Sequence, residues 1–220
     1  MKLITGITQR ILWIITLACM KIFCNFYVSG KENLKGIRRP LMIVANHRSY
    51  WDALILGALL PFSSRNFPVG FIADDGLFSK PLFKFFFAGF GVFPANRGKG
   101  LDISLRDFRK TLAENRTVII FPYGRRIYGD HKEFGIGRGA ATLVQEFGNL
   151  TILPVFLRTT PGLSLKKFLF GKNEMGVIAG RPYNIPNASH MGQEEISKIL
   201  VNSFLELNER AATAPVLASN

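Results

Sequence analysis

The sequence predicts one α/β domain with a mixed, largely parallel sheet flanked by helices, and an N-terminal membrane-associated helical segment before it. Short runs of apolar and β-branched residues alternate with longer amphipathic stretches, which is the pattern of strands alternating with helices. The 220 residues fit a single domain, since domains usually hold roughly 100–200 residues. Residues 3–28 are mostly apolar and carry cations at their polar interruptions, which separates them from the alternating region.

The composition narrows the classes of function. Hydrophobic residues make up 48% and charged residues 20%, which is too apolar for a disordered chain and too charged for a polytopic membrane protein. The net charge of +13 indicates an anionic partner, such as a nucleic acid, an anionic lipid or a phosphorylated substrate. The sequence has neither zinc-ligand spacing nor an aromatic RNA-binding run. We therefore expect no nucleic-acid partner, and a basic nucleic-acid-binding protein is the weakest alternative.

The N-terminal segment, residues 1–40, combines an apolar helix with a basic connector. Its uninterrupted apolar part, Ile11 to Met20, is ten residues long, whereas a spanning helix needs about 20. We expect a helix in or against the bilayer surface, with Arg10 and Lys21 reaching the phosphates and Trp13 at the interface. The alternative is an ordinary helix that covers the core. We expect the first of these, with membrane association at the cytoplasmic face, and we expect the two cysteines to be free thiols in a reducing compartment.

One stretch has the features of a reacting site. The apolar run from Leu41 to Ala45 predicts a buried strand, and Ala53 to Leu60 predicts a helix. Ser49 is a good N-cap, and Asp52 stands three residues after it, as in a capping box. His47 and Asp52 therefore lie at a strand-to-helix junction, where α/β proteins place reacting groups. A carboxylate on one imidazole nitrogen leaves the other nitrogen as a base; a purely structural capping box is the alternative.

The remaining chain continues the alternation. Further strands are expected over residues 69–73, 91–93, 117–121, 151–157 and 176–179. Further helices are expected over residues 79–88, 102–115, 135–147 and 194–210. The helix over 79–88 carries phenylalanine on every face, which favours partial contact with lipid. We expect the domain proper to span 41–210 and the small, polar residues 211–220 to form a disordered tail.

Four stretches carry a resemblance to a known family. NHRSYWD spans residues 46–52, GVFPANRG spans 91–98, IFPYGRR spans 120–126 and ILPV spans 152–155. In order and spacing they resemble the four blocks of the glycerolipid acyltransferases, the glycerol-3-phosphate and lysophosphatidic acid acyltransferases. The first is similar to NHxxxxD, the second ends in a substrate-binding Arg, the third is usually FPEGTR and the fourth is an apolar strand with a Pro. The resemblance covers roughly residues 41–186.

The resemblance implies an acyltransferase of phospholipid biosynthesis. A fatty acyl group would move from a thioester, on acyl-CoA or acyl carrier protein, to a hydroxyl of a lipid-type acceptor such as lysophosphatidic acid. His47 would take the proton of that hydroxyl, and Asp52 would orient His47 and stabilise the imidazolium. The implied partners are the acyl donor, an anionic lipid acceptor and a membrane surface. No cofactor and no metal are required.

The resemblance also implies the substrate-binding residues, which are Arg97, Tyr123, Gly124, Arg125 and Arg126. Arg97 would hold a phosphate, and Gly124 would let the backbone approach the substrate. The third block departs from the family, because Tyr123 replaces the usual Glu, Arg125 the usual Thr, and Ile127 a common Ser. If Tyr123 and Arg125 both face the site, the site is more positive by two charges, which favours a strongly anionic substrate. A non-catalytic lipid- or acyl-carrier-binding relative is the alternative.

Overall fold

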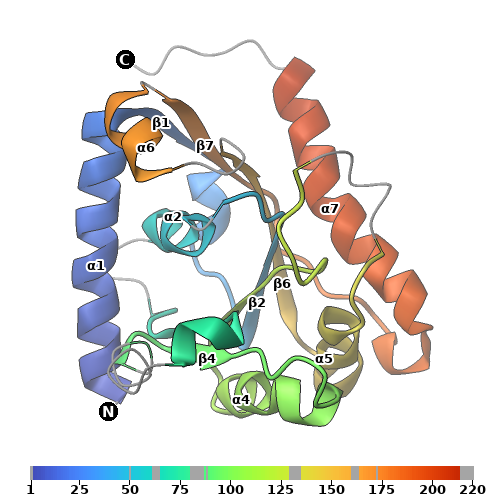
Figure 1. The fold of residues 1–220 in the computed structure, drawn as a ribbon. Coiled ribbons are helices and arrows are strands. Elements are labelled where there is room, and N and C mark those ends of the chain that lie inside the picture. The colour runs from blue at the N-terminus through green and yellow to red at the C-terminus, as the bar shows by residue number, and fades with distance from the viewer. Residues whose placement is uncertain are drawn as a thin grey trace.

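The computed structural model describes residues 2–49, 51–60, 65–79, 87, 89–128, 135–159, 164–171 and 173–213. One seven-stranded sheet, in the order β1-β7-β6-β2-β5-β3-β4, runs through this part of the chain (Figure 1). Its strands are β1 (Cys24–Ser29), β2 (Leu41–Ala45), β3 (Val69–Ala73), β4 (Val92–Pro94), β5 (Thr117–Ile120), β6 (Thr151–Arg158) and β7 (Asn173–Ala179). Neighbouring strands are parallel except β6 and β7, which are antiparallel. The prediction of a mixed, largely parallel sheet is confirmed.

Helices cover both faces of the sheet. They are α1 (Lys2–Phe23), α2 (Asp52–Leu59), α4 (Leu101–Ala113), α5 (Gly139–Phe147), α6 (Leu165–Phe170) and α7 (Gln193–Thr213), with short 3₁₀ turns η1 (Lys31–Leu34), η2 (Asp75–Phe78) and η4 (Ala188–His190). One apolar core joins the sheet to α1, α2 and α6, and a second joins it to α4, α5 and α7. The central strand β2 supplies Leu41, Ile43 and Ala45 to the first core and Met42 and Val44 to the second. Its five residues are all buried, as expected of a central strand covered on both faces.

Several helices and strands begin and end where predicted, and others differ from the prediction. Strands β2 and β3 have the predicted bounds, and α4 buries the predicted stripe of Leu105, Phe108 and Leu112. Helix α5 begins at Gly139, later than predicted, because the glycine-rich residues before it do not favour a helix. Helix α6 was not predicted. The phenylalanine-rich helix expected over 79–88 and the tail over 211–220 lie largely outside the described residues.

The apolar N-terminal stretch divides into a helix and a strand. Helix α1 ends at Phe23, and the following residues form β1, which pairs in parallel with β7. The sequence indicated a helix as far as residue 28, so this strand is a correction. Phe26, Tyr27 and Val28 have high strand propensity, and pairing with a distant strand decides between the two structures. The sheet therefore extends across the expected boundary at residue 41.

Helix α1 packs one face on the protein and turns a row of isoleucines outward. The inward row includes Gln9, Trp13, Thr16 and Met20, and Trp13 packs on Phe67 with ring centroids 4.5 Å apart. The outward row is formed by Ile4, Ile7, Ile11, Ile14, Ile15 and Ile22. The expectation that Trp13 lies at a membrane interface is therefore wrong, because the side chain belongs to the core. The stretch Ile4–Phe23 is long and apolar enough, by length and composition, to cross a membrane.

Buried polar contacts attach α1 to the sheet. The side-chain amide of Gln9 donates to the carbonyl oxygens of Val69 and Phe90, both at 2.7 Å. Its oxygen accepts from the N–H of Val69 at 2.8 Å. One turn further along α1, the Trp13 ring packs against Gly57 of α2. Any side chain added at Gly57 would overlap this ring, so the two helices approach closely. Gln9 interrupts the apolar sequence pattern because its side chain faces the protein and makes these buried hydrogen bonds.

Candidate active site

The junction after β2 is fixed to the neighbouring strand by one buried amide. The side chain of Asn46 donates to the carbonyl oxygen of Leu157 at 2.9 Å and accepts from its N–H at 2.7 Å. The Asn46 side chain is fully buried, and Leu157 belongs to β6. These two hydrogen bonds hold the chain at the carboxyl end of β2 where the next residue, His47, leaves the sheet. The sequence resemblance included Asn46 in its first block but indicated no role for it.

The imidazole of His47 meets a fully buried carboxylate. Its Nδ1 lies 2.7 Å from Oδ2 of Asp52, in the first turn of α2. The same oxygen accepts from the backbone N–H groups of Arg48 at 2.6 Å and Ser49 at 2.8 Å. The other oxygen accepts from the hydroxyls of Ser49 at 2.6 Å and Thr159 at 3.1 Å. Five donors therefore converge on this buried side chain and fix its position at the start of α2.

The capping box predicted around Ser49 is present in a changed form. The carboxylate of Asp52 accepts from the N–H of Ser49, as a capping box requires. Helix α2 begins at Asp52, however, and the Ser49 hydroxyl accepts from the N–H of Trp51 at 3.2 Å while donating to Asp52. Ser49 is therefore a residue that positions the carboxylate. Thr159, which follows β6, has the same role and lies far away in the sequence, so no local pattern could indicate it.

The His47 ring is held between the carboxylate and an aromatic ring. It stacks on Phe121 with centroids 4.1 Å apart and planes inclined by 13°. Because Asp52 is a hydrogen-bond acceptor, Nδ1 carries the proton in the neutral imidazole, and Nε2 keeps its lone pair. The ring is partly exposed and lines a cavity of about 890 Å³. The arrangement is that of a positioned general base.

Backbone contacts join the predicted blocks to one another. The N–H of Ile127 donates to the carbonyl oxygen of His47 at 2.8 Å. The Arg97 guanidinium donates to the carbonyl oxygen of Gly124 at 2.9 Å. Gly124 has φ of +63°, a left-handed conformation that favours glycine in this turn. The first, second and third blocks therefore meet at the carboxyl ends of the parallel strands.

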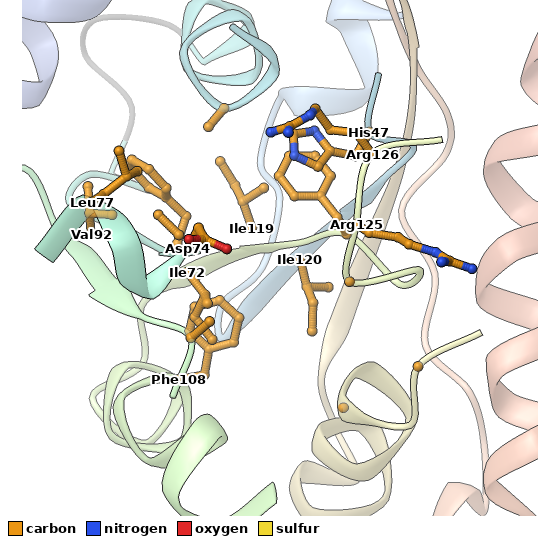
Figure 2. A pocket seen from close by; sticks show the side chains of 18 of the residues that line it. His47, Ile72, Asp74, Leu77, Val92, Phe108, Ile119, Ile120, Arg125 and Arg126 are labelled. Carbon is orange, nitrogen blue, oxygen red and sulfur yellow. The ribbon is translucent and has the colours of Figure 1, made fainter. Parts of the chain in front are cut away.

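The cavity gathers four of the five predicted substrate-binding residues. Arg97, Gly124, Arg125 and Arg126 line it together with His47. In the view of Figure 2, the Arg126 side chain extends in the direction of His47, whereas the guanidinium of Arg125 extends away from His47 toward the side of α7. The two charged side chains of the third block therefore do not point the same way.

Tyr123 differs from the other predicted site residues. Its side chain is only 7% exposed and packs in the core shared with α4, α5 and α7. Tyr123 does not line the cavity, although its neighbours Pro122 and Gly124 do. The expectation that Tyr123 faces the site is not met, because its side chain packs into the core behind the turn while the residues on both sides of it line the cavity. The aromatic ring at this position fills volume in the core that also contains Ile127.

Apolar side chains form most of the remaining cavity wall. They come from α1, α2, the sheet and α4, and include Leu12, Leu54, Phe71, Phe90, Phe108 and Ile119. The volume lies within the range of about 300–1,000 Å³ of sites that take small molecules and cofactors. The charged and titratable side chains of the lining are His47, the three arginines and Asp74, while the remaining wall is mostly apolar. The cavity therefore suits a ligand with a charged head and a long apolar body.

A short turn holds the backbone that carries Arg97. The carboxylate of Asp75, at the start of η2, accepts from the N–H of Asn96 at 2.8 Å and of Arg97 at 3.0 Å. The hydrogen bond from Arg97, followed by that from Asn96, lowers the pKa of Asp75. The neighbouring Asp74 places a carboxylate oxygen 3.9 Å from the Arg97 side chain, an exposed ion pair of small energetic effect. Neither aspartate was indicated by the sequence.

Comparison with known proteins identifies relatives of this chain. In curated sequences, the chain is 29% identical to a 1-acyl-sn-glycerol-3-phosphate acyltransferase of Saccharomyces cerevisiae over 73% of its length, which is 52% of that protein. It is 25% identical to a chloroplastic 1-acyl-sn-glycerol-3-phosphate acyltransferase of Arabidopsis thaliana over 80% of its length, which is 49% of that protein. The chain thus spans about half the length of these relatives.

A solved structure has a similar fold. It is the 1-acyl-sn-glycerophosphate acyltransferase PlsC from Thermotoga maritima, with a TM-score of 0.65, 19% identity, and coverage of 90% of this chain and 77% of that one. At this identity the likeness establishes the fold alone. Residues 25–158, more than half of the chain, match the acyltransferase family. The chain therefore belongs to the acyltransferase family.

Proposed function

We propose that the chain transfers a fatty acyl group from a thioester to the hydroxyl of an anionic lysophospholipid, such as lysophosphatidic acid. One observation carries the proposal. His47, with Nδ1 2.7 Å from a fully buried Asp52, stands in the wall of an apolar cavity that also includes three arginines. The names of the curated relatives support the same substrate class.

The chemistry follows from the tautomer of His47. Nε2 takes the proton of the acceptor hydroxyl as its oxygen attacks the thioester carbonyl carbon. A C–O bond forms, and the carbonyl electrons move onto oxygen to give a tetrahedral intermediate. When the intermediate collapses, the C–S bond breaks and the thiolate receives the proton from Nε2, so the imidazole returns to its neutral form. The Asp52 carboxylate stabilises the imidazolium between the two steps.

The cavity supplies separate surroundings for the two ends of a lipid. Arg97 and Arg126 line the polar part and would bind a phosphate through charge-assisted hydrogen bonds. The apolar part of the wall, which includes Leu12 and Phe108, would bury an acyl chain. Each buried methylene contributes about 0.8 kcal/mol to the free energy of binding. Arg125 points toward α7, so its charge would act at the rim of the site. Acyl-CoA and acyl carrier protein both present the required thioester.

The outward face of α1 supports binding to a membrane surface. Its six exposed isoleucines run along a helix of 22 residues, while buried contacts of Gln9 and Trp13 attach the opposite face to the protein. A helix with one face on the protein and an apolar face outward suits a position in the bilayer plane. We propose that α1 lies in the cytoplasmic surface of a membrane, where lysophospholipid acceptors are present.

A direct test supplies purified protein with acyl-CoA or acyl carrier protein thioesters and a set of lysolipid acceptors, in micelles. Mass spectrometry would identify the acylated product, and thiol release would give its rate. The proposal predicts product from a lysophospholipid with a phosphate monoester and little from an uncharged monoacylglycerol. Thiol release without any acylated lipid would contradict it. Binding of acyl donor with no turnover for any acceptor would favour the non-catalytic alternative, which the altered third block suggests.

A further inference from the structure

The connection between β6 and β7 carries the most exposed large apolar side chain in the described part of the chain. This side chain is Phe170, 78% exposed at the end of α6. The helix begins after Ser164, whose hydroxyl accepts from the N–H of Lys167 at 3.3 Å. Lys166 and Lys167 are also exposed, so one short helix presents an aromatic ring beside two cations.

Helix α6 lies beside the C-terminal end of α1. Phe168, on its buried side, lies 5.9 Å from the Phe23 ring of α1, measured between centroids. Figure 1 shows the two helices next to each other at that end of α1. Here α1 exposes Ile22 by 72% and also exposes Lys21. Two elements far apart in the sequence therefore bring exposed apolar and cationic side chains to one end of the molecule.

The charges at this end select one kind of partner. Neither α1 nor α6 contains an acidic residue. A second copy of the chain would oppose lysine to lysine, which is unfavourable. An anionic bilayer would attract Lys21, Lys166 and Lys167 through its headgroups and accept Phe170 and Ile22 between them. Lysine stems flanking inserted apolar side chains are typical of such surfaces.

The buried side of the same connection touches the reacting junction. Phe168 stacks on Trp51 with centroids 5.3 Å apart and planes inclined by 15°, and Trp51 immediately precedes Asp52. Thr159, at the other end of the connection, donates to the Asp52 carboxylate. A bilayer that contacts the outer side of α6 would therefore lie one side-chain layer from the turn that holds the base.

We propose that α6 is a second membrane-contact element beside α1, in which Phe170 inserts into the bilayer and Lys166 and Lys167 bind anionic headgroups. The inference rests on the proposed function and deepens it, since it names where the membrane meets the site. It also predicts that the bilayer covers α6 together with the outward face of α1, so that the His47–Asp52 turn lies near the lipid surface.

The test measures sedimentation with vesicles made of equal parts phosphatidylcholine and phosphatidylglycerol. Phe170→Ser should lower the vesicle partition coefficient roughly tenfold, because the variant loses one inserted aromatic side chain. Ile103→Ser, an exposed apolar position on α4, is the matched control and should leave it unchanged. Lys166→Glu and Lys167→Glu should each lower binding at least about fivefold, more at low salt, whereas Lys110→Glu on α4 should not.

A gain-of-signal experiment complements the losses. Phe170→Trp should add fluorescence that shifts to shorter wavelength with these vesicles and is quenched by brominated lipid. Since Phe170 is largely exposed, these variants should keep the melting temperature of the parent protein. Unchanged partition of Phe170→Ser, or an added tryptophan that brominated lipid does not quench, would overturn the inference. So would conversion of a dimer to a monomer by Phe170→Ser, which would identify the patch as a contact between copies.

The outcomes separate this inference from the proposed function. Acyl transfer measured in micelles does not depend on a bilayer. If the protein is active in micelles but the substitutions of Phe170, Lys166 and Lys167 do not change vesicle binding, the α6 inference alone is overturned. Absence of turnover with every acceptor would overturn the proposed function, while the vesicle data would still decide whether α6 contacts lipid.

Discussion

Ile127 donates its backbone N–H to the carbonyl oxygen of His47 across 2.8 Å, so the third block supports the residue of the first block that would act as base. The side chain of Ile127 is fully buried in the core shared with α4, α5 and α7, which also contains Tyr123. The two departures from the family at these positions thus enlarge apolar packing behind the turn. They do not alter the wall of the cavity that faces His47.

The buried position of Tyr123 gives a prediction that separates packing from substrate binding. Tyr123→Phe should leave the KM for the acceptor unchanged, because the ring lies outside the cavity wall. Tyr123→Glu should lower the melting temperature, because an ionised carboxylate in an apolar core is strongly disfavoured. Thermal unfolding followed by circular dichroism, with KM measured below the transition, tests both variants. A stable Tyr123→Glu protein with a changed acceptor preference would show that the side chain does reach the substrate.

The turn that carries Arg97 should depend on the ionised form of Asp75. Hydrogen bonds from the N–H groups of Arg97 and Asn96 lower the Asp75 pKa. A lowered native pKa means that the stabilisation is complete above the unfolded pKa, about 4, and is lost as pH falls through the native value. The amides of Asn96 and Arg97 should therefore be protected from hydrogen exchange at pH 6 and lose protection below pH values of about 4.

The same turn can be tested at neutral pH by substitution. Asp75→Asn removes the charge that accepts both N–H groups, so the KM for a phosphorylated acceptor should rise with little change in kcat. Glu194→Gln, in an exposed ion pair with Lys198 on α7, is the matched loss of one surface carboxylate. Equal KM values for the parent and Asp75→Asn would remove Arg97 from the phosphate site, or show that another contact fixes its backbone.

The two faces of α1 predict opposite effects of substitution. Ile7→Ser, Ile11→Ser and Ile14→Ser together should weaken vesicle binding while leaving the melting temperature near that of the parent, because these side chains are exposed. Trp13→Ala should instead destabilise the fold by about 3–5 kcal/mol, because a large buried ring is lost from the core. Vesicle sedimentation and thermal unfolding of both variants give the comparison. The account would be wrong if the triple variant unfolded and Trp13→Ala did not.

Features that neighbouring residues encode were predictable from the sequence, and features that depend on distant contacts were not. The bounds of β2 were predictable because a strand buried on both faces is a continuous apolar run with a sharp end at Asn46. The contact of His47 with Asp52 was also within reach, since both residues belong to one short junction. Strand β1 was not, because Cys24 to Ser29 continues the apolar character of α1 and becomes a strand only by pairing with β7.

The site contains contacts that no local pattern encodes. Thr159 donates to Asp52 from the end of another strand, and Asp75 accepts from the turn of Arg97 across 22 residues. The orientation of Tyr123 was misjudged because a tight turn around Gly124 decides which side chains face the cavity. Trp13 was assigned to a membrane interface from composition, whereas helical phase places it in the core.

The most direct test of the proposed function is the turnover of His47→Ala with a verified donor and acceptor. Removing a positioned general base should lower kcat by about 10²–10⁴-fold while the melting temperature stays near that of the parent. Asp52→Asn should be less severe, because the imidazole is retained and only the carboxylate that orients it and stabilises the imidazolium is lost. The account predicts the order parent, Asp52→Asn, His47→Ala in falling rate. A folded His47→Ala protein that transfers acyl groups at nearly the parent rate would contradict it.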